Sequence, residues 1–375
     1  NQSYTHSGGD QTAPTGTAPA AITGVNSCLP TQTQADAAFD ATLAASGYSD
    51  HCGGTVTAEM VSAVISGTKC SWSVDYTFKV KDECGNYSNN QSYTHSGGDQ
   101  TAPTGTAPAA ITGVNSCLPT QTQADAAFDA TLAASGYSDH CGGTVTVELV
   151  SAVISGTKCN WTITYTFKAK DECGNYLNNQ SYTRSGGDQT APTGSAPAAI
   201  TGVNSCLPTQ SEADASFDAA LAASGYTDGC GGVVTAELVS AVVSGSKCSW
   251  SILYTFKVKD ECGNVLNGQS YKRSGSDQTA PTGSAPAAIT GVNSCLPTQS
   301  EANASFDAVY AASGYTDGCG GVVTAELVSA VVSGSKCSWS ILYTFKVKDE
   351  CGNELSGQNY TRSGSDQSAP SGTAP

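Results

Sequence analysis

The sequence predicts a mostly β protein made of tandem copies of one small domain. Asn1–Thr57 recurs unchanged as Asn90–Thr146, a shift of 89 residues, and Val233–Asn264 recurs unchanged as Val322–Asn353. Each copy also contains a stretch of alternating apolar and polar residues, which is typical of a half-buried strand. Because solenoid repeats are usually about 20–50 residues long, a longer copy is expected to fold as a separate domain.

The repetition predicts four full repeats and two partial ones. Repeats 1 to 4 are expected at residues 12–100, 101–189, 190–278 and 279–367. Residues 1–11 match the end of a preceding repeat, and residues 368–375 match the start of a following linker. The first residue is not methionine, so we expect a window from a longer array, with any signal peptide, anchor or terminal head outside it.

The clearest strand lies at residues 72–81. Trp72, Tyr76 and Phe78 fall on one side of this strand and polar residues on the other, as in an antiparallel sheet with one solvated face. Three further strands are expected in repeat 1, at Ala20–Cys28, Thr55–Ser66 and Tyr87–Ser96.

One short helix is expected between residues 30 and 47. Thr31 and Gln34 have the spacing of a capping box, which predicts the start of the helix. Phe39 and Leu43 lie on its apolar face, so a helix of about three turns is expected to cover the sheet as a lid.

Composition argues against several classes of function. The chain has 16 Lys and Arg against 32 Asp and Glu, a net charge of −16, so it lacks the basic clusters that contact nucleic-acid phosphates. It contains no run of 18 apolar residues that would predict a membrane span.

Each repeat contains four cysteines, which in repeat 1 are Cys28, Cys52, Cys70 and Cys84. No Cys-x-x-Cys pair occurs and the chain has only 4 His, so a zinc site has few ligands available. An even number of cysteines in a small domain predicts disulfides and an oxidising, extracellular compartment.

The strand at residues 72–81 limits how these cysteines can pair within a repeat. Cys70 and Cys84 flank it and are expected roughly 45 Å apart at about 3.3 Å per residue, far beyond the reach of a disulfide. Two connectivities remain after that exclusion. In a sandwich, Cys28 and Cys70 are expected at one end and Cys52 and Cys84 at the other. This predicts the pairs Cys28–Cys70, Cys52–Cys84, Cys117–Cys159, Cys141–Cys173, Cys206–Cys248, Cys230–Cys262, Cys295–Cys337 and Cys319–Cys351.

The motifs Ser49–Gly54 and Lys81–Asn86, with Trp72 and Tyr76 between them, resemble HYR-like immunoglobulin-type repeats. Such repeats occur in giant secreted adhesins of gliding bacteria, of the SprB type, which use type IX secretion. The resemblance covers every full repeat. It implies a tandem array of immunoglobulin-like β-sandwiches on the bacterial cell surface, each with the inserted helix and two disulfides. It also implies a filament stalk that a motility machine drives along the cell.

No enzyme is expected. His51 and His140 are replaced by Gly229 and Gly318 in the later repeats, and His95 is replaced by arginine, as at Arg184. A catalytic Ser-His-Asp or Cys-His arrangement would therefore lack its base in repeats 3 and 4.

No cofactor is expected apart from calcium at the joints between repeats. If each repeat is immunoglobulin-like, the end of repeat 2 that bears Asp139, Asp171 and Glu172 faces the incoming linker with Asp99. Several carboxylates meeting there would supply the oxygen ligands that Ca²⁺ prefers. The alternative is that each is an ordinary turn residue.

These observations predict a structural stalk segment of a cell-surface adhesin, giving reach and force transmission in adhesion or gliding motility. Its expected partners are neighbouring repeats of the same chain, with motility or secretion machinery reached through regions outside this window. The alternative is a multivalent array that binds surface polysaccharide through recurrent aromatic residues. Tyr48, Tyr137, Tyr226 and Tyr315 are the recurrent candidates, and packing is the alternative role for them.

Overall fold

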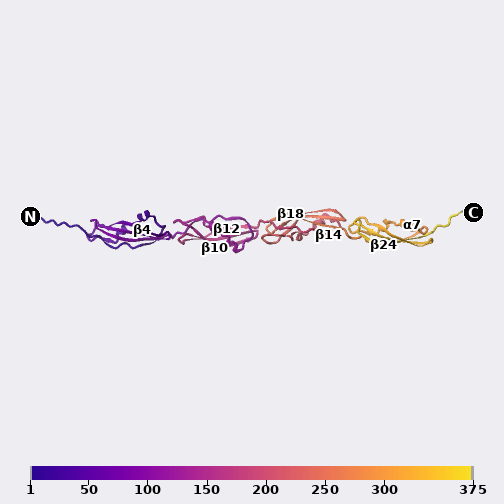
Figure 1. Cartoon of the computed structure of the whole chain (residues 1–375), viewed down its shortest axis with the longest axis horizontal. Coiled ribbons are helices and arrows are strands. Elements are labelled where there is room, and N and C mark those ends of the chain that lie inside the picture. Colours follow the sequence, from indigo (N-terminus) through magenta and orange to yellow (C-terminus); the bar gives the residue numbers. More distant parts are fainter. Residues whose placement is uncertain (1, 373–375) are drawn as a thin grey trace. The chain divides into compact units, whose positions relative to one another are not determined.

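The structure is a computed structural model that describes residues 2–372. These residues divide into two compact units, with the boundary between Asp188 and Gln189, and each unit is described by itself. Each unit contains two of the predicted repeats. In Figure 1, the strands of each repeat occupy a single interval of the colour bar, so every repeat is built from one continuous stretch of sequence.

Repeat 1 is built on a four-stranded mixed sheet in the order β2-β6-β5-β4. Its strands are β2 (Ile22–Asn26), β4 (Thr57–Thr68), β5 (Ser71–Lys81) and β6 (Tyr87–Gly98). β4, β5 and β6 pair antiparallel, whereas β2 pairs parallel with β6. The mostly β prediction and all four predicted strands are confirmed.

The other repeats contain the same sheet. In repeat 2 the strands are β8 (Ile111–Asn115), β10 (Thr146–Thr157), β11 (Asn160–Lys170) and β12 (Tyr176–Gly187). In repeat 3 they are β14 (Ile200–Asn204), β16 (Thr235–Ser246), β17 (Ser249–Lys259) and β18 (Val265–Ser276). In repeat 4 they are β20 (Ile289–Asn293), β22 (Thr324–Ser335), β23 (Ser338–Lys348) and β24 (Glu354–Ser365).

Two helices and a two-stranded ribbon cover one face of the sheet. In repeat 1 these are α1 (Gln32–Ala37), α2 (Ala41–Ala45), and β1 (Thr15–Gly16) paired with β3 (Tyr48–Ser49). The equivalents are α3 (Gln121–Ala126), α4 (Ala130–Ala134), β7 (Thr104–Gly105) and β9 (Tyr137–Ser138) in repeat 2. In repeat 3 they are α5 (Gln210–Ala215), α6 (Ala219–Ala223), β13 (Thr193–Gly194) and β15 (Tyr226–Thr227). In repeat 4 they are α7 (Gln299–Ala304), α8 (Ala308–Ala312), β19 (Thr282–Gly283) and β21 (Tyr315–Thr316).

The prediction of one helix is wrong, because the chain forms two. The capping box of Thr31 and Gln34 is confirmed at the start of α1. Asp40 then caps a new helix, since its carboxylate accepts a hydrogen bond from the backbone N–H of Leu43 at 2.9 Å. The first helix ends at its C-cap Ala38, and Asp40, with extended backbone angles, is the N-cap of the second.

The core of each repeat lies between the sheet and this cover. Trp72, Val74, Tyr76, Phe78 and Val80 of β5 are all at most 5% exposed, as the alternating pattern predicts. Each of the four core clusters draws its residues from one predicted repeat. Within residues 2–372, the buried apolar residues of each repeat therefore form a hydrophobic core of their own.

Of the two residues predicted to pack onto the sheet as a lid, Phe39 and Leu43, only Phe39 does so. The ring of Phe39 lies 5.6 Å from that of Tyr76 and 6.0 Å from that of Phe78, so it closes the core of repeat 1. Leu43 is only half-buried, and its neighbour Ala44 is fully buried instead.

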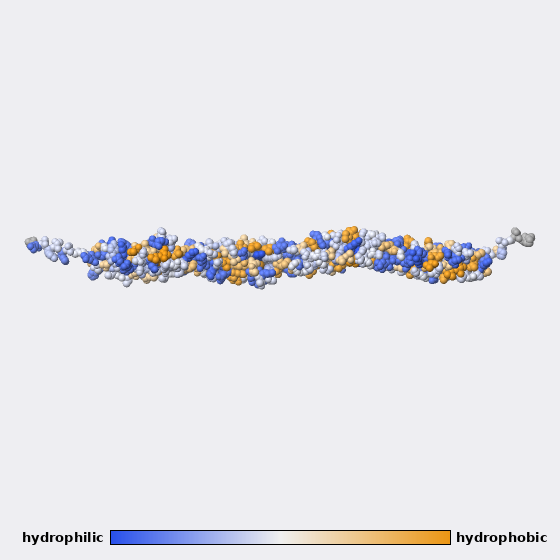
Figure 2. Space-filling model, viewed as in Figure 1, coloured by the Kyte–Doolittle hydropathy of each residue, from blue (hydrophilic) through white to orange (hydrophobic). Residues whose placement is uncertain are grey.

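The opposite face of the sheet faces solvent. Val61 and Val64 of β4 are 61% and 57% exposed. In Figure 2, orange apolar patches of the surface alternate with blue and white ones. Among the described residues, no helix is both long and apolar enough to cross a membrane.

Candidate functional site at the joint between repeats

Each repeat has two ends with different chemistry, here called the tail end and the head end. The tail end of repeat 1 carries Cys28 and Cys70. Trp72 fixes this end, because its Nε1 donates a hydrogen bond to the carbonyl oxygen of Ser27 at 3.0 Å. Gly98 at the end of β6 packs so closely against Cys70 that a Cβ at Gly98 would lie 2.1 Å from the Cys70 carbonyl oxygen.

The head end of repeat 2 carries Cys141 and Cys173 and receives the segment that leaves repeat 1. Asn175 holds this segment, since its Nδ2 donates to the backbone oxygen of Asp99 at 3.1 Å. The same amide donates to Asp171 Oδ2 at 2.7 Å, so Asp171 orients Asn175. The tail end of repeat 1 and the head end of repeat 2 therefore meet at Asp99.

Two disulfides cross this joint. Cys28 of repeat 1 is bonded to Cys141 of repeat 2, and Cys70 is bonded to Cys173. The paired Cα atoms lie 5.1 and 4.9 Å apart, across sequence separations of 113 and 103 residues. The second unit repeats the arrangement with Cys206–Cys319 and Cys248–Cys351.

The predicted pairing within repeats is therefore wrong. The structure contradicts Cys28–Cys70, Cys52–Cys84, Cys141–Cys173, Cys206–Cys248, Cys295–Cys337 and Cys319–Cys351. Cys117, Cys159, Cys230 and Cys262 are also disulfide-bonded, and the pairs Cys117–Cys159 and Cys230–Cys262 stay predictions.

The reason for the error is specific. Cys28 and Cys70 lie at the same end of repeat 1, as predicted, but each bonds to the head end of the next repeat instead of to the other. Spacing within one repeat contains no information about that contact. Four cysteines of the described residues remain free and exposed: Cys52, Cys84, Cys295 and Cys337.

An ion pair accompanies the disulfides. Lys69 Nζ of repeat 1 lies 3.5 Å from Glu172 Oε2 of repeat 2, and Lys247 Nζ lies 3.9 Å from Glu350 Oε2 in the second unit. Glu172 Oε1 accepts a hydrogen bond from the Thr144 backbone N–H at 3.0 Å. The Thr144 N–H and then the charge of Lys69 lower the pKa of Glu172.

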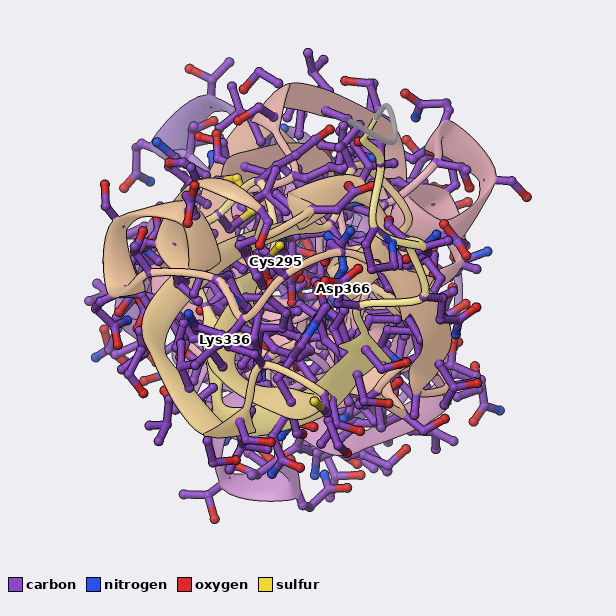
Figure 3. All side chains as sticks on the ribbon, turned by 90° about the vertical axis from the view of Figure 1, so that its right-hand side faces the viewer. Cys295, Lys336 and Asp366 are labelled. Atoms are coloured by element: carbon purple, nitrogen blue, oxygen red, sulfur yellow. A yellow bond between two sulfur atoms is a disulfide. The ribbon has the colours of Figure 1, made fainter. Side chains whose placement is uncertain are left out.

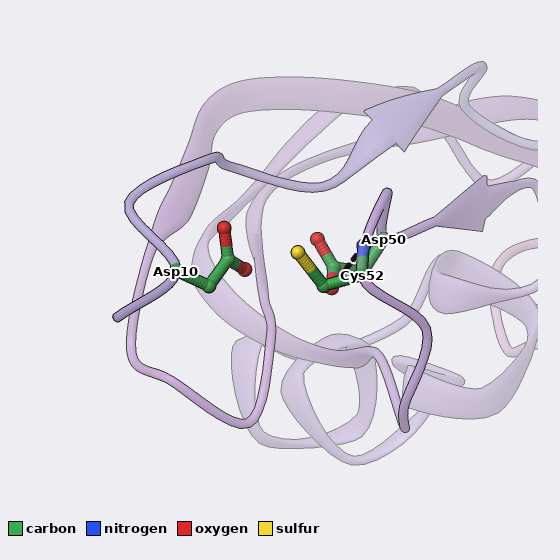
Figure 4. A group of neighbouring side chains, drawn as sticks. All are labelled: Asp10, Asp50 and Cys52. Atoms are coloured by element: carbon green, nitrogen blue, oxygen red, sulfur yellow. Dashed lines mark hydrogen bonds between the residues drawn. The ribbon is translucent and has the colours of Figure 1, made fainter. Parts of the chain in front are cut away.

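Two of the predicted calcium ligands lie together at the joint. Asp99 and Asp139 each place a carboxylate oxygen within a group whose atoms are all within 4.8 Å of one another, beside Cys141 Sγ. Glu172 is not a member of this group. The same geometry occurs for Asp10, Asp50 and Cys52, which Figure 4 shows facing one another, and for Asp277, Asp317 and Cys319.

One carboxylate oxygen of each aspartate lacks a hydrogen-bond partner. Asp99 is 5% exposed, and its Oδ1 accepts from the Thr101 N–H at 3.0 Å whereas its Oδ2 has no partner. In Asp139, Oδ2 accepts from the Cys141 N–H at 2.9 Å and Oδ1 has no partner. Buried oxygens without a donor are costly, so a cation beside the pair would stabilise this arrangement.

The third predicted aspartate has a different role. Burial acts to raise the pKa of Asp171, but hydrogen bonds from Asn175 and from the N–H groups of Cys173 and Gly174 outweigh burial and lower it. In the second unit, burial raises the pKa of Asp317, and the charges of Asp277 and Asp349 raise it further. Asp349, the equivalent of Asp171, therefore lies close enough to add negative charge to the aspartate pair.

The recurrent tyrosines pack inside the repeats. Tyr48 and Tyr137 are each 8% exposed, and Tyr226 and Tyr315 are each 5% exposed. Tyr48 OH donates to Gln91 Oε1 at 2.6 Å, and its ring contacts Phe78 edge-on. The packing role is confirmed, and these residues do not form an exposed aromatic surface.

No family model and no curated protein matches this chain. A solved structure of the sialic acid binding region of the Streptococcus sanguinis SK1 adhesin, bound to 3'sLn, is similar over 97% of this chain and 100% of that chain. The identity is 11% and the TM-score is 0.19. At that TM-score the similarity establishes neither the fold nor a ligand of this chain.

Proposed function

We propose that this chain is a structural stalk segment of an extracellular surface adhesin, in which linked repeats provide reach and carry force. The observation that supports this proposal is the pair of disulfides between successive repeats in each unit. Folded domains on a flexible string do not require such bonds. A chain that must remain joined under tension does benefit from them.

The disulfides limit how far the chain can extend even after a repeat unfolds. An unlinked segment of 113 residues, the separation of Cys28 and Cys141, would span roughly 370–410 Å when extended, at about 3.3–3.6 Å per residue. The bond keeps the two Cα atoms 5.1 Å apart. Unfolding of one repeat therefore releases little length, and the neighbouring repeat stays attached.

The disulfides also stabilise the repeats against unfolding. In the chain-entropy model, a closed loop of about 100 residues contributes about 4–5 kcal/mol, which is a large part of the stability of a small domain. Reducing compartments would break such bonds, so their number supports a location outside the cell. The resemblance to HYR-like repeats supports an immunoglobulin-like, non-catalytic repeat of an SprB-type gliding-motility adhesin on a bacterial surface.

Single-molecule pulling of the chain by its two ends tests the proposal. We expect the total released length to be at least several hundred Å greater after reduction with dithiothreitol than before, because each crossing disulfide hides a long segment. A chain with all cysteines changed to serine is the matched control and should behave like the reduced chain. Equal release in oxidised and reduced chains would contradict the proposal.

A polysaccharide-binding array is the second candidate. A shallow groove lined by Ala41, Tyr48, Asp50 and Ala58 in repeat 1 recurs in repeat 3 at Ala219, Tyr226, Asp228 and Ala236. Changing Ala41 and Ala219 to arginine would fill both grooves. If the native chain binds a glycan and this variant does not, the result favours a polysaccharide-binding array. If the native chain binds no glycan, the array hypothesis is rejected.

A further inference from the structure

We propose that the aspartate pair at a joint, Asp99 with Asp139 in the first unit, binds one divalent cation of the calcium type. Asp99 belongs to the segment that leaves repeat 1, and Asp139 belongs to the head end of repeat 2. The cation therefore fastens neighbouring repeats to each other in addition to the disulfides. This inference goes beyond the proposed function, because neither a stalk nor a polysaccharide-binding array requires a cation.

Asp99 carries a buried charge that no basic residue balances. It is 5% exposed, and its Oδ2 has no hydrogen-bond partner. Among the ion pairs of residues 2–372, none joins a lysine or arginine to Asp99 or to Asp139. Buried charges in proteins are paired or coordinate a metal. A cation bound beside Asp99 supplies the positive charge that the protein itself does not.

Asp139 places a second carboxylate at the same point. One carboxylate oxygen of Asp99, one of Asp139 and the Sγ atom of Cys141 all lie within 4.8 Å of one another. Oxygen ligands of Ca²⁺ lie about 2.3–2.6 Å from the ion, so two ligands of one ion are at most about 5 Å apart. The two carboxylates therefore lie close enough together to bind a single ion.

Charge and ligand type favour a cation of the calcium type. Two carboxylates carry two negative charges, which one divalent ion balances. The sulfur of Cys141 is bonded to Cys28, so the protein ligands are hard oxygen atoms. Ca²⁺ accepts six to eight oxygen ligands in flexible geometry and takes water among them, whereas Mg²⁺ demands a nearly ideal octahedron. The group contains no histidine and no free thiol, the ligands that suit zinc and copper.

Turn formation accounts for only part of each aspartate. Asp99 Oδ1 accepts a hydrogen bond from the Thr101 N–H at 3.0 Å, and Asp139 Oδ2 accepts one from the Cys141 N–H at 2.9 Å. Asparagine forms such turns equally well and without a charge. These bonds occupy one oxygen of each carboxylate and leave the other without a partner. The turns therefore do not explain why two charges lie together.

The aspartate of the outgoing segment is buried where a head end meets it. Asp366 is the equivalent of Asp99 in repeat 4, and Figure 3 looks onto the end of the chain that bears it. Its N–H donates to the Lys336 carbonyl oxygen at 3.4 Å, as that of Asp99 does to Lys69 at 3.0 Å. Within residues 2–372 no repeat follows Asp366, and this residue is exposed. Docking of a head end thus buries the first carboxylate and brings the second one to it.

The same pair occurs at other positions of the array. Asp10 with Asp50 in the first unit and Asp277 with Asp317 in the second form groups of the same kind, each beside a cysteine. Figure 4 shows Asp10, Asp50 and Cys52 pointing toward one another. Asp277 is 4% exposed, so its charge is as deeply buried as that of Asp99. Each unit therefore has at least one pair with a buried member.

Hydrogen exchange of the full, disulfide-bonded chain in about 1 mM CaCl2 or in EDTA tests the proposal, at a concentration suited to weak extracellular sites. The Cys141 and Gly142 N–H groups bond to Asp139, so their exchange reports on this site. Calcium should slow it about 2- to 10-fold, as expected for dissociation constants of about 0.1–1 mM. NaCl of equal ionic strength, about 3 mM, should have no such effect.

The double variant Asp99→Asn with Asp139→Asn removes one pair and leaves another as an internal control. Residues 139–149 should lose the calcium response, whereas residues 50–60, beside the intact pair of Asp10 and Asp50, should keep it. The two segments differ in sequence at Val147 and Leu149, so mass spectrometry separates them. Glu172→Gln changes a carboxylate of the joint that lies outside the group, and this variant should keep both responses.

Three outcomes would overturn the proposal. The first is equal exchange of the native chain in calcium and in EDTA, a result that does not depend on any variant folding. The second is an equal response to NaCl, which would indicate general screening. The third is a response of residues 139–149 that survives in the double variant. The pulling experiment on the disulfides involves no calcium, so failure here leaves the stalk proposal standing.

Discussion

Trp72 Nε1 donates a hydrogen bond to the carbonyl oxygen of Ser27 at 3.0 Å, one residue before the cysteine that crosses to the next repeat. The tryptophan itself is 5% exposed and belongs to the core. This side chain therefore connects the core of one repeat to the bond with its neighbour, beside the Ser27 N–H, which donates to the Gly98 carbonyl oxygen at 3.2 Å.

Replacing Trp72 with phenylalanine should destabilise repeat 1 by about 2–3 kcal/mol. The change leaves the Ser27 carbonyl oxygen without its donor and creates a cavity beside β5. Hydrogen exchange measured on residues 70–79 checks this, because their sequence differs from that of the equivalent residues 159–168. Protection in residues 159–168 should not change, and equal loss in both segments would contradict a local effect.

Replacing Gly97 with alanine should destabilise repeat 1 by more than about 2 kcal/mol. A Cβ at this position would lie 2.1 Å from the Val25 carbonyl oxygen and 2.8 Å from the Trp72 ring, so β2 must shift. Gly8 has no atom within 4 Å of its Cβ position, and Gly8→Ala is the control with no expected effect. Thermal unfolding of the two variants side by side measures the difference.

Replacing Asp40 with alanine should cost about 1 kcal/mol, because α2 loses the cap that its carboxylate provides to the Leu43 N–H. Asp40→Ser keeps an oxygen that can accept the same hydrogen bond and should restore most of the loss. Chemical denaturation of both variants checks the prediction. If serine were as destabilising as alanine, the cap would not be the cause.

The ion pair of Lys69 and Glu172 should add a small pH dependence to the joint. The pKa of Glu172 is lowered in the folded chain, by the Thr144 N–H first and Lys69 second. Its contribution is therefore complete above the ordinary glutamate pKa of about 4.3 and is lost as pH falls through the lower folded value. The side chains are 38% and 48% exposed, so solvent screens the pair and its contribution should be small.

Comparison of the native chain with Glu172→Gln isolates this contribution from that of the other carboxylates. The difference in unfolding free energy between the two should be constant from pH 7 to about pH 5 and should shrink below about pH 4. A difference that grows as the solution becomes more acidic would contradict the assignment.

Much of one repeat was predictable from local patterns. The alternation from Trp72 to Val80 gave β5 and its buried face, and the capping box at Thr31 gave the start of α1. The break at Asp40 was missed, although an aspartate three residues before Leu43 is itself a cap signal. Because the segment is rich in alanine, the sequence pattern did not show whether Ala44 or Leu43 would enter the core.

The sequence by itself determined the repeat, the strands and the end at which each cysteine lies, because all of these depend on residues close together in the chain. Only the tertiary structure decided which cysteines bond and which aspartates face each other. Cys28 meets Cys141 across 113 residues, and Asp99 meets Asp139 only when two repeats dock. Because the repeats are nearly identical, the sequence spacing allows each cysteine several partners. The way in which neighbouring repeats dock decides which of these partners it bonds to.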